Sequence, residues 1–330
     1  MKAYAEWQEQ ECLIISLPHK DTDWKDYIDD ILKGYLEFAK VVSKYQKLLI
    51  IHSKSSDLTE FKKLDNVDFF EYECDDTWIR DYGGIDVFDD KNIITYNFIF
   101  NAWGDKFNSK KDNALNEILY KDYFKTPLKN IDLILEGGSI DFNQKGFMIT
   151  TSKCLLNDNR NKIDKNTLDK RLKEFFGLDE ILWLDNGFIK GDDTDSHVDT
   201  LARFLSDDVI AYASCDDEND EHFYELKAME NELKIYADKF GFKLVPLPLP
   251  KPSFYDNKKL PFTYLNFVFI NGALVVPTYN DKNDELVLQR LKECVQDRDI
   301  VGVDSSVFCR QNGSLHCSCI NRYKRWLFVI

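Results

Sequence analysis

Short runs of apolar, β-branched and aromatic residues recur along the 330 residues of the chain. Turn-forming or charged residues border each run, and this combination is typical of β-strands. We therefore predict strands at residues 12–17, 48–51, 93–100, 133–135, 147–151, 209–213, 265–277 and 300–303.

A second pattern lies between several of these runs. Apolar residues at steps of three and four positions predict helices that bury one face. Trp24, Ile28, Ile31 and Tyr35 begin one such series. The same spacing predicts helices over residues 24–42, 168–175, 223–240 and 287–295.

Strands that alternate with helices indicate an α/β protein, yet some strands follow one another directly. Residues 265–270 and 273–276 are joined by Asn271-Gly272, a dipeptide typical of a β-hairpin. Residues 133–135 and 147–151 flank a polar stretch that contains glycine. The pattern favours a mixed α/β architecture over a purely parallel, doubly wound sheet.

The chain contains no Gly/Ser-rich linker and no exact repeat. Its only proline-dense stretch, residues 246–252, is predicted to be a stiff extended connection. We therefore predict a single domain over residues 1–330.

Composition narrows the class of protein further. The hydrophobic fraction is 44% and the charged fraction is 31%, which is typical of a globular protein. No apolar run approaches the roughly 18 residues of a membrane span. Asp and Glu outnumber Lys and Arg by 58 to 43, for a net charge of −15, so nucleic acid and anionic membranes are not expected partners. The charge could steer a cationic ligand or serve solubility alone.

The eight cysteines are scattered along the chain without a Cys-x-x-Cys pair. Residues 1–11 are polar and acidic and lack the apolar core of a signal peptide. These features predict reduced thiols and a cytoplasmic location. They give no support to a zinc ribbon or a thioredoxin-like site.

The first segment that suggests chemistry is 75–84, where Asp75, Asp76 and Asp81 surround Trp78 ahead of two glycines. A solvated acidic loop would have this composition. Alternatively, the carboxylates and the aromatic face could receive a planar cation such as a guanidinium.

A second segment places Glu136 at the end of an apolar strand, before Gly137-Gly138-Ser139. Such a glycine pair is often only a turn. Glu136 would nevertheless be well placed to reach a site at the strand end.

The third segment, residues 191–199, surrounds a histidine with acids. In extended backbone, Asp195, His197 and Asp199 would share one face, and a histidine beside carboxylates can act as acid and base. A metal site is the competing interpretation, but the segment fails the spacing of an EF-hand loop. None of the other four histidines forms a familiar ligand pair with His197.

The fourth segment, residues 311–319, contains Cys317 and Cys319 after a glycine turn and His316. Either thiol could be a nucleophile, a buried structural cysteine or half of a regulatory disulfide. Spacing does not decide between them. A thiol, a histidine, carboxylates and an aromatic wall together suit attack on a cationic amidine carbon better than acyl transfer.

Seven motifs, in order, resemble those of the agmatine deiminase family, which is related to the bacterial peptidylarginine deiminases in the guanidine-modifying pentein superfamily. Ser196 stands where that family usually has glycine, and residues 312–315 have lost two glycines. The similar stretches are AEW at 5–7, DDTWIRD at 75–81, LEGGS at 135–139, CLLNDNRN at 154–161, TDSHVD at 194–199, YLNF at 264–267 and NGSLHC at 312–317.

The resemblance implies an α/β propeller of five ββαβ-like units around a central active site. It implies that Cys317 is the nucleophile, that His197 is the general acid and base, and that Asp81 and Asp199 clamp the guanidinium. It also breaks the tie between the cysteines, because Cys317 follows His316 as in the family. Residues implied to bind the substrate are Asp75, Trp78, Glu136 and Asn266.

The implied reaction converts agmatine to N-carbamoylputrescine and ammonia through an amidino adduct on Cys317. The reaction uses a small cationic guanidine as its substrate and requires no metal or organic cofactor. A homodimer is a possible oligomeric state. Because the loop around Cys317 is altered, free arginine and peptidyl arginine remain rival substrates. The carboxylate of arginine would need a basic partner, and the candidates are Arg80, Arg203, Arg310 and Arg322. Two rival hypotheses are a non-catalytic polyamine-binding protein and a metal-dependent hydrolase centred on residues 192–199.

Overall fold

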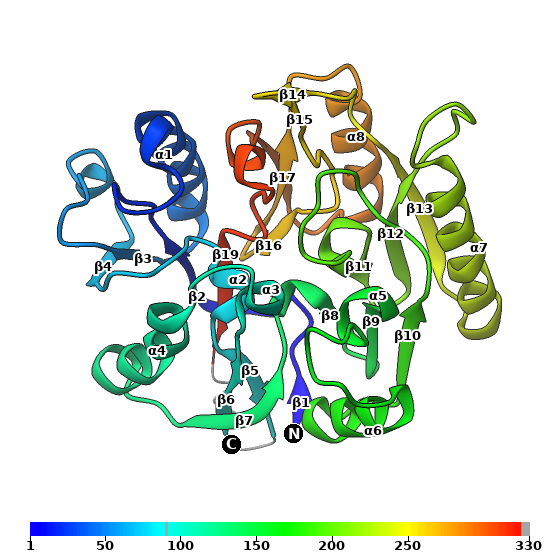
Figure 1. Cartoon of the computed structure of the whole chain (residues 1–330), viewed down its shortest axis with the longest axis horizontal. Helices are drawn as coiled ribbons and strands as arrows, with labels where there is room; N and C mark the ends of the chain where they lie inside the picture. The colour runs from blue at the N-terminus through cyan, green and yellow to red at the C-terminus, as the bar shows by residue number, and fades with distance from the viewer. Residues whose placement is uncertain (90–91, 325–330) are drawn as a thin grey trace.

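The computed structural model describes residues 1–89 and 92–324. In this part of the chain, five small α/β units surround a common centre (Figure 1). In each unit two antiparallel strands are followed by a helical crossover to a third strand, which pairs in parallel with the second. The fold class implied by the resemblance is therefore confirmed.

The first unit joins the two ends of the described chain. Its strand order is β19-β2-β3-β4, with β19 antiparallel to β2 and the remaining pairs parallel. Because β19 pairs with β2, the segment that carries Cys317 is fixed at the centre of the molecule. The elements are β2 (Gln10–Ser16), α1 (Ile28–Tyr45), β3 (Leu48–His52), β4 (Val67–Glu71) and β19 (Cys319–Tyr323).

The second unit has the order β1-β5-β6-β7, and the short helix α2 (Ile79–Tyr82) comes directly before β5 in the sequence. The third unit has the order β10-β9-β8. The elements of the second are β1 (Lys2–Ala3), β5 (Ile85–Phe88), β6 (Ile93–Ile99), α3 (Ala102–Asp105), α4 (Lys110–Leu119) and β7 (Leu128–Ile134). Those of the third are β8 (Ile140–Phe142), β9 (Phe147–Thr151), α5 (Ser152–Leu155), α6 (Lys165–Phe176) and β10 (Glu180–Leu184).

The fourth and fifth units have the orders β11-β12-β13 and β16-β17-β18, and the small hairpin β14-β15 lies between them in the sequence. The elements of the fourth are β11 (Ala202–Ser206), β12 (Val209–Ser214), α7 (Phe223–Phe240) and β13 (Lys243–Pro248). The others are β14 (Phe254–Tyr255), β15 (Lys258–Lys259), β16 (Val268–Ile270), β17 (Ala273–Thr278), α8 (Asp284–Cys294) and β18 (Asp299–Asp304).

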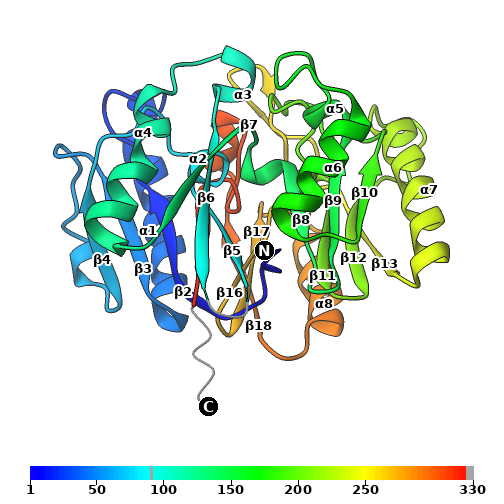
Figure 2. The same ribbon diagram turned by 90° about the horizontal axis from the view of Figure 1, so that it is seen from below.

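The periodic apolar faces of the helices pack against the sheets and leave the helices at the periphery (Figure 2). In α1, Ile31, Tyr35 and Phe38 are fully buried against the first sheet, and full burial of an Ile or Phe side chain stabilises the fold by about 1.5–3 kcal/mol. In α6, the Asp164 side chain accepts a hydrogen bond from the Thr167 amide, and Gly177 ends the helix in the left-handed conformation.

Each of the four predicted helices is present, and the hairpin at Asn271-Gly272 is confirmed with Gly272 at φ 77°. The proline-dense stretch was predicted wrongly in its first half, because Pro246 and Pro248 lie in β13. Within the described part of the chain this strand pairs with β12 alone, and an edge strand tolerates proline because one side of its backbone needs no partner.

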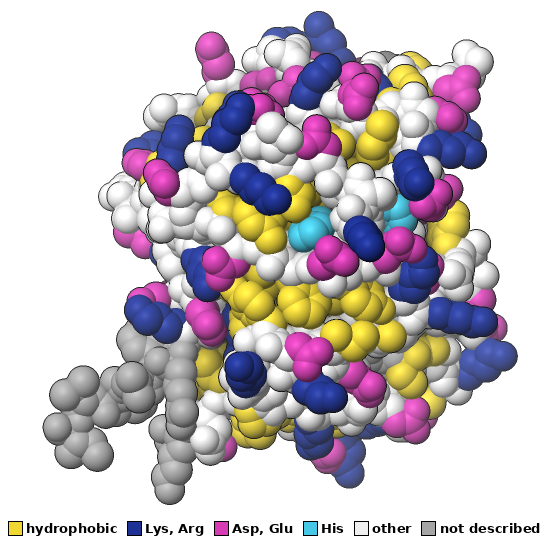
Figure 3. All heavy atoms as spheres, turned by 90° about the vertical axis from the view of Figure 1, so that its left-hand side faces the viewer, with side chains coloured by type: hydrophobic (Ala, Val, Ile, Leu, Met, Phe, Trp, Pro, Cys, Tyr) yellow, Lys and Arg dark blue, Asp and Glu magenta, His cyan; other side chains and the backbone are white. Residues whose placement is uncertain are grey.

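Two properties of the described residues bear on possible partners. None of the helices is both long and apolar enough to cross a membrane. On the face shown in Figure 3, lysine and arginine side chains are interspersed with aspartate and glutamate, so that face has no patch of a single sign.

Candidate active site

Four loop segments from different units meet at the centre of the ring. They carry Asp81 in α2, Gly138 after β7, His197 and Asp199 before β11, and Cys317 before β19. A Cβ atom added to Gly138 would lie 2.7 Å from His197 Nδ1, 2.9 Å from Asp81 Oδ1 and 3.1 Å from Asp199 Oδ2. A side chain at this position would therefore displace the groups expected to surround the reacting carbon.

Asp81 is buried and fixed from two sides. Its Oδ2 accepts a hydrogen bond of 2.9 Å from Trp103 Nε1, and its Oδ1 accepts one of 2.9 Å from the Gly138 amide. Burial raises the pKa of Asp81 well above its ordinary value, and the neighbouring Asp199 and Glu136 carboxylates raise it further. A cation bound here would stabilise the charged carboxylate and reverse part of that shift.

Trp103 is a site residue that the sequence did not reveal. It lies in α3 with a left-handed backbone (φ 57°, ψ 37°), and Ala102 and Asp105 also have positive φ. Strained backbone of this kind persists where surrounding contacts enforce it. Here Asn101 Oδ1 accepts from the Gly104 amide, and the strained turn aims the indole N–H at Asp81.

Asp199, Asn266 and Cys317 form a second connected group. Asn266 Nδ2 donates to Asp199 Oδ2 at 3.1 Å, while Asn266 Oδ1 accepts from the Cys317 amide at 3.2 Å. Cys317 Sγ lies 3.8 Å from Asp199 Oδ2. Asn266 therefore positions two proposed reactive groups. The second oxygen of Asp199, Oδ1, is buried without a protein partner among the described residues.

His197 is fully buried, and neither of its ring nitrogens has a hydrogen-bond partner in the described protein. Its Nδ1 lies 3.7 Å from Asp81 Oδ1. Burial lowers the pKa of His197 to about 3, although Asp199 opposes the shift. The imidazole is therefore neutral at pH 7 and can accept a proton.

Cys317 and Cys319 have different surroundings. Cys317 lines the central pocket, whereas the Cys319 thiol points to the carbonyl of Leu315 at 3.2 Å in the core. Both are free thiols. Burial, with Asp199 and Asp81 nearby, raises the pKa of Cys317 well above its ordinary value. The thiol therefore keeps its proton until a cation or a base stabilises the thiolate.

The pocket in front of Cys317 is acidic and aromatic. Its volume, counted to the open mouth, is ≈ 480 Å³. No lysine or arginine occurs among the described residues that line it. The lining consists of Asp23, Trp24, Asp76, Trp78, Asp81, Trp103, Phe107, Asp193, Thr194, Gln311, Asn312, Gly313 and Cys317.

The acids of this pocket fall into two groups. Besides burial, the neighbours that raise the pKa of Asp81 are Asp199 and Glu136, whereas those that raise the pKa of Asp76 are chiefly Asp23 and Asp193. Burial raises the pKa of Asp76 to about 7, and the repulsion of Asp23 and Asp193 adds to the shift. One pocket therefore presents carboxylates at two places, one of them beside the thiol.

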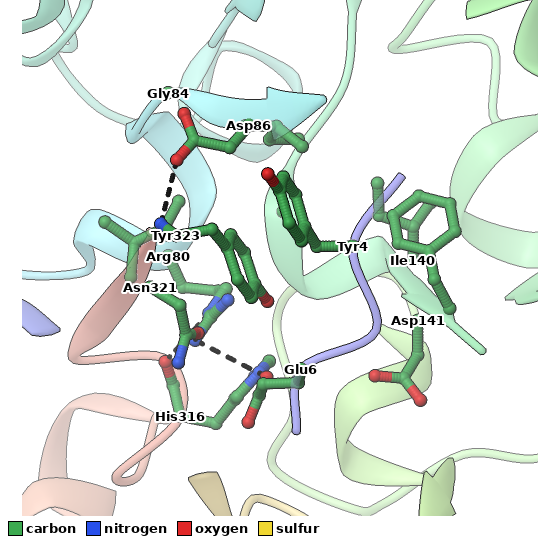
Figure 4. Close-up of a pocket in the computed structure, with 14 residues that line it drawn as sticks. Tyr4, Glu6, Arg80, Gly84, Asp86, Ile140, Asp141, His316, Asn321 and Tyr323 are labelled. Carbon is green, nitrogen blue, oxygen red and sulfur yellow. Dashed lines mark hydrogen bonds and ion pairs between the residues drawn. The ribbon is translucent and has the colours of Figure 1, made fainter. Parts of the chain in front are cut away.

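A buried network adjoins the segment that carries Cys317, and Figure 4 shows three of its members, Glu6, Arg80 and His316, on the wall of another pocket. His316 Nδ1 lies 2.7 Å from Asp199 Oδ2, and His316 Nε2 lies 2.7 Å from Glu6 Oε2. Arg203 Nη2 donates to the same Glu6 oxygen at 2.8 Å. The network holds Asp199 in place from the side opposite the pocket, and sequence reasoning missed Glu6 because a lone acid in AEW carries no chemical signal.

The structure of the third segment, residues 191–199, corrects the expectation of an extended backbone. Asp195 and Ser196 have left-handed backbone (φ 67° and 69°), so the segment is not extended and its alternate residues do not share a face. Asp195 instead receives Arg160 Nη1 at 2.7 Å. Asp192 accepts hydrogen bonds from the Thr194 hydroxyl and the Ser196 amide, so it shapes the loop that holds His197.

Three of the four residues expected to bind substrate, Asp75, Glu136 and Asn266, lie outside the pocket lining. Asp75 Oδ2 accepts a hydrogen bond from the Lys111 amide at 2.8 Å, and its neighbour Asp76 faces the pocket instead. Glu136 is fully buried with Oε1 held by Arg160 Nε at 2.7 Å. Trp78 lines the pocket as expected.

Cys317 and Asp81 line the pocket, and the buried His197 and Asp199 lie within 4 Å of them. A thiol, a neutral imidazole and two carboxylates so close together fit the hydrolysis of a cationic C–N centre, where the electrophile brings its own positive charge. Comparison with known proteins agrees with this class. The chain is a hydrolase that acts on the C–N bond of an amidine or guanidine. Residues 2–322 match the model of the Porphyromonas-type peptidyl-arginine deiminases, and the chain belongs to that family.

Three similar proteins refine the comparison. A cysteine-to-serine variant of the C. jejuni agmatine deiminase, solved with substrate bound, is 54% identical, with a TM-score of 0.95 over 98% of this chain and 96% of that one. The agmatine deiminase of Pseudomonas aeruginosa is 27% identical over 95% of this chain and 93% of its own. An amidinotransferase from Microseira wollei, 12% identical over 99% of this chain and 98% of its own with a TM-score of 0.55, shares the fold.

Proposed function

We propose that the chain hydrolyses agmatine to N-carbamoylputrescine and ammonia, with Cys317 as the nucleophile. The observation that carries this proposal is the pair of carboxylate groups in one pocket without a lysine or arginine among its described lining residues. Agmatine has a guanidinium at one end and an ammonium at the other. Asp81 and Asp199 suit the guanidinium, and Asp76 with its acidic neighbours suits the ammonium.

Arginine fits this pocket less well, because its carboxylate would face Asp76 rather than a base. The four arginines considered from the sequence have other partners. Arg203 binds Glu6 and Asp141, and Arg322 binds Asp86. Arg80 donates to Asn321, and Arg310 pairs with Asp30. Lys106, close to the pocket, pairs with Asp195 at 3.6 Å.

In the first step, the guanidinium binds between Asp81 and Asp199 and places its carbon at the Cys317 sulfur. Its charge stabilises the thiolate, so the thiol proton passes to His197, whose ring nitrogens have no other partner among the described residues. The thiolate then attacks the carbon. Fixed carboxylates and a positioned nucleophile supply the orientation on which the rate depends.

In the second step, His197 returns its proton to the departing nitrogen, and ammonia leaves an amidino adduct on Cys317. The neutral imidazole then takes a proton from water as the water attacks the same carbon. The carbon–sulfur bond breaks, the ureido product is released and the thiol is restored. One imidazole thus takes up the thiol proton, gives it as an acid to the departing nitrogen and then acts as base toward water, and no metal is required.

Replacing either carboxylate of the guanidinium clamp, Asp81 or Asp199, should strongly reduce catalytic efficiency. We expect Asp81→Asn and Asp199→Asn each to lower kcat/KM by at least about 10²-fold, because a charge-assisted hydrogen bond is worth roughly 1.5–3 kcal/mol and a misplaced carbon slows the chemical step further. Steady-state kinetics on agmatine measures the loss. Asp75→Asn is the matched control, since Asp75 faces the Lys111 amide outside the pocket. Equal, small losses in all three variants would contradict the clamp.

Asp76 provides a test at the other end of the pocket. Its carboxylate predominates above its pKa of about 7 and is lost as the pH falls through that value, while both ends of agmatine stay cationic. We expect kcat/KM for agmatine to fall by up to about tenfold per pH unit below pH 7. In Asp76→Asn this dependence should flatten, and KM should rise by roughly 10–100-fold.

Butylguanidine, which lacks the amine, is the control substrate. The Asp76→Asn exchange should change its KM by less than about threefold, because no ammonium is left to pair. If Asp76→Asn impaired agmatine and butylguanidine equally, Asp76 would have no part in recognising the amine.

We further propose that the protein works in the cytoplasm, as a single catalytic domain and as a homodimer. The outer strand β4 supports the last point: among the described strands it pairs with β3 alone, and residues Val67 to Phe70 are only half-buried. Hydrophobic side chains gather in a band on the corresponding face in Figure 3. Light scattering that gives twice the chain mass of 38.7 kDa would support the dimer, and a single chain mass would contradict it.

A further inference from the structure

Three donor groups outside the substrate clamp converge in the interior. Glu136, Cys154 and His197 each present one ligand atom, and these atoms all lie within 4.8 Å of one another. All three residues are fully buried. They come from the end of β7, from α5 and from the loop before β11, so the fold rather than a local sequence motif brings them together.

Several polar atoms of this cluster have no hydrogen-bond partner among the described residues. Glu136 Oε2 and both nitrogens of His197 are buried without a hydrogen-bond partner in the described protein. Arg160 holds the other oxygen of Glu136 at 2.7 Å and so aims Oε2 away from itself. Buried polar atoms without partners are costly and rare, and here two residues with such atoms stand beside a thiol.

The position of Cys154 is fixed by the same loop that carries His197. Thr151 Oγ1 accepts a hydrogen bond from the Cys154 amide at 3.4 Å and donates to the carbonyl of Ser196 at 2.7 Å. The helix that carries the thiol is thereby tied to the residue before His197. The proposed reaction assigns no task to the Cys154 thiol.

We propose that Glu136, Cys154 and His197 form an inhibitory site for a thiophilic divalent cation such as Zn²⁺. Thiolate, imidazole and carboxylate are the three ligand types that Zn²⁺ combines in proteins. The metal would bind Cys154 Sγ, His197 nitrogen and Glu136 Oε2, and the thiol proton would be released on binding.

Geometry and charge are compatible with such a site. Bonds of about 2.0–2.3 Å require the ligand atoms to approach by about an ångström from their present separation, which rotation of the side chains can provide. Arg160 opposes the cation, but the Asp81, Asp195 and Asp199 carboxylates lie near the cluster and favour it. Three protein ligands leave one position open.

The consequence is reversible inhibition. A metal that holds His197 prevents the ring from carrying protons between Cys317, the leaving nitrogen and water. This consequence rests on the proposed role of His197 in the reaction, whereas the binding of the metal does not. The two parts can therefore fail separately, and the experiment measures them separately.

Binding is tested with Co²⁺ as a spectroscopic substitute for Zn²⁺, in the Cys317→Ser variant so that the nucleophile cannot contribute a thiolate. We expect one Co²⁺ per chain and a near-ultraviolet thiolate-to-cobalt charge-transfer band. The band should disappear in the Cys317→Ser/Cys154→Ser double variant. Absence of the band in Cys317→Ser, or its persistence in the double variant, would overturn the site.

Inhibition is tested with Zn²⁺ on chains that keep Cys317. Cys154→Ser and Cys154→Ala should retain basal turnover within about threefold, which also shows that they fold. The Zn²⁺ concentration that halves activity should rise at least tenfold in both variants, and a chelator should restore the wild-type rate. Unchanged sensitivity to Zn²⁺ in folded Cys154 variants would contradict the inhibitory role.

Discussion

Cys317→Ser and Cys317→Ala should abolish turnover of agmatine while leaving its binding measurable. The clamp and the acidic pocket would remain intact, and only the atom that forms the covalent bond would be lost. Isothermal titration with agmatine checks binding, and ammonia release checks turnover. In the wild-type chain, rapid acid quench and mass spectrometry should find the amidino adduct on the peptide that contains Cys317.

Cys319→Ser is the matched control, because its thiol lies two residues away and points to the Leu315 carbonyl in the core. We expect it to retain most of the activity, since its sulfur does not face the pocket. An adduct on Cys319, or full activity in Cys317→Ala, would remove Cys317 from the mechanism.

His197→Ala should slow both halves of the reaction by about 10²–10⁴-fold, which is the usual loss when a general acid–base group is removed. Both halves should be affected because, in the proposed mechanism, the same ring protonates the departing nitrogen and later deprotonates water. Rapid-quench measurements of adduct formation and adduct decay follow the two steps separately.

His52→Ala is a suitable control for the histidine exchange, because His52 lies at the end of β3 with its Nδ1 next to the Ser53 carbonyl, away from the pocket. It should leave both rates within a few-fold. Adduct formation and decay at wild-type rates in His197→Ala would contradict its role in proton transfer.

The sequence pattern predicts the local elements of the fold, but not how distant elements pair. Apolar periodicity identified α1, α6, α7 and α8, because each buries a regular stripe. It missed α4, whose sequence KKDNALNEIL is largely polar and buries few apolar side chains. Periodicity also could not reveal that β19 pairs with β2, since that contact joins distant parts of the chain.

The candidate site was anticipated best where a residue type carries its own chemistry. Cys317, His197, Asp81 and Asp199 do meet at the centre of the ring. The sequence did not reveal the supporting residues Trp103 and Glu6, because they act through contacts that form only when the chain folds. The sequence could not show which of Asp75 and Asp76 faces the pocket, because the direction of each side chain depends on the conformation of the turn and not on residue type.

The choice of substrate is tested most directly by one comparison of rates. Purified wild-type protein is offered agmatine, free arginine and an arginyl peptide, and both ammonia and the ureido product are measured for each. We expect agmatine to be converted to N-carbamoylputrescine with a kcat/KM at least about 10²-fold above that for the other two, because only agmatine pairs an ammonium with the acids around Asp76. Equal or faster conversion of arginine or the peptide to a citrulline product would contradict the account.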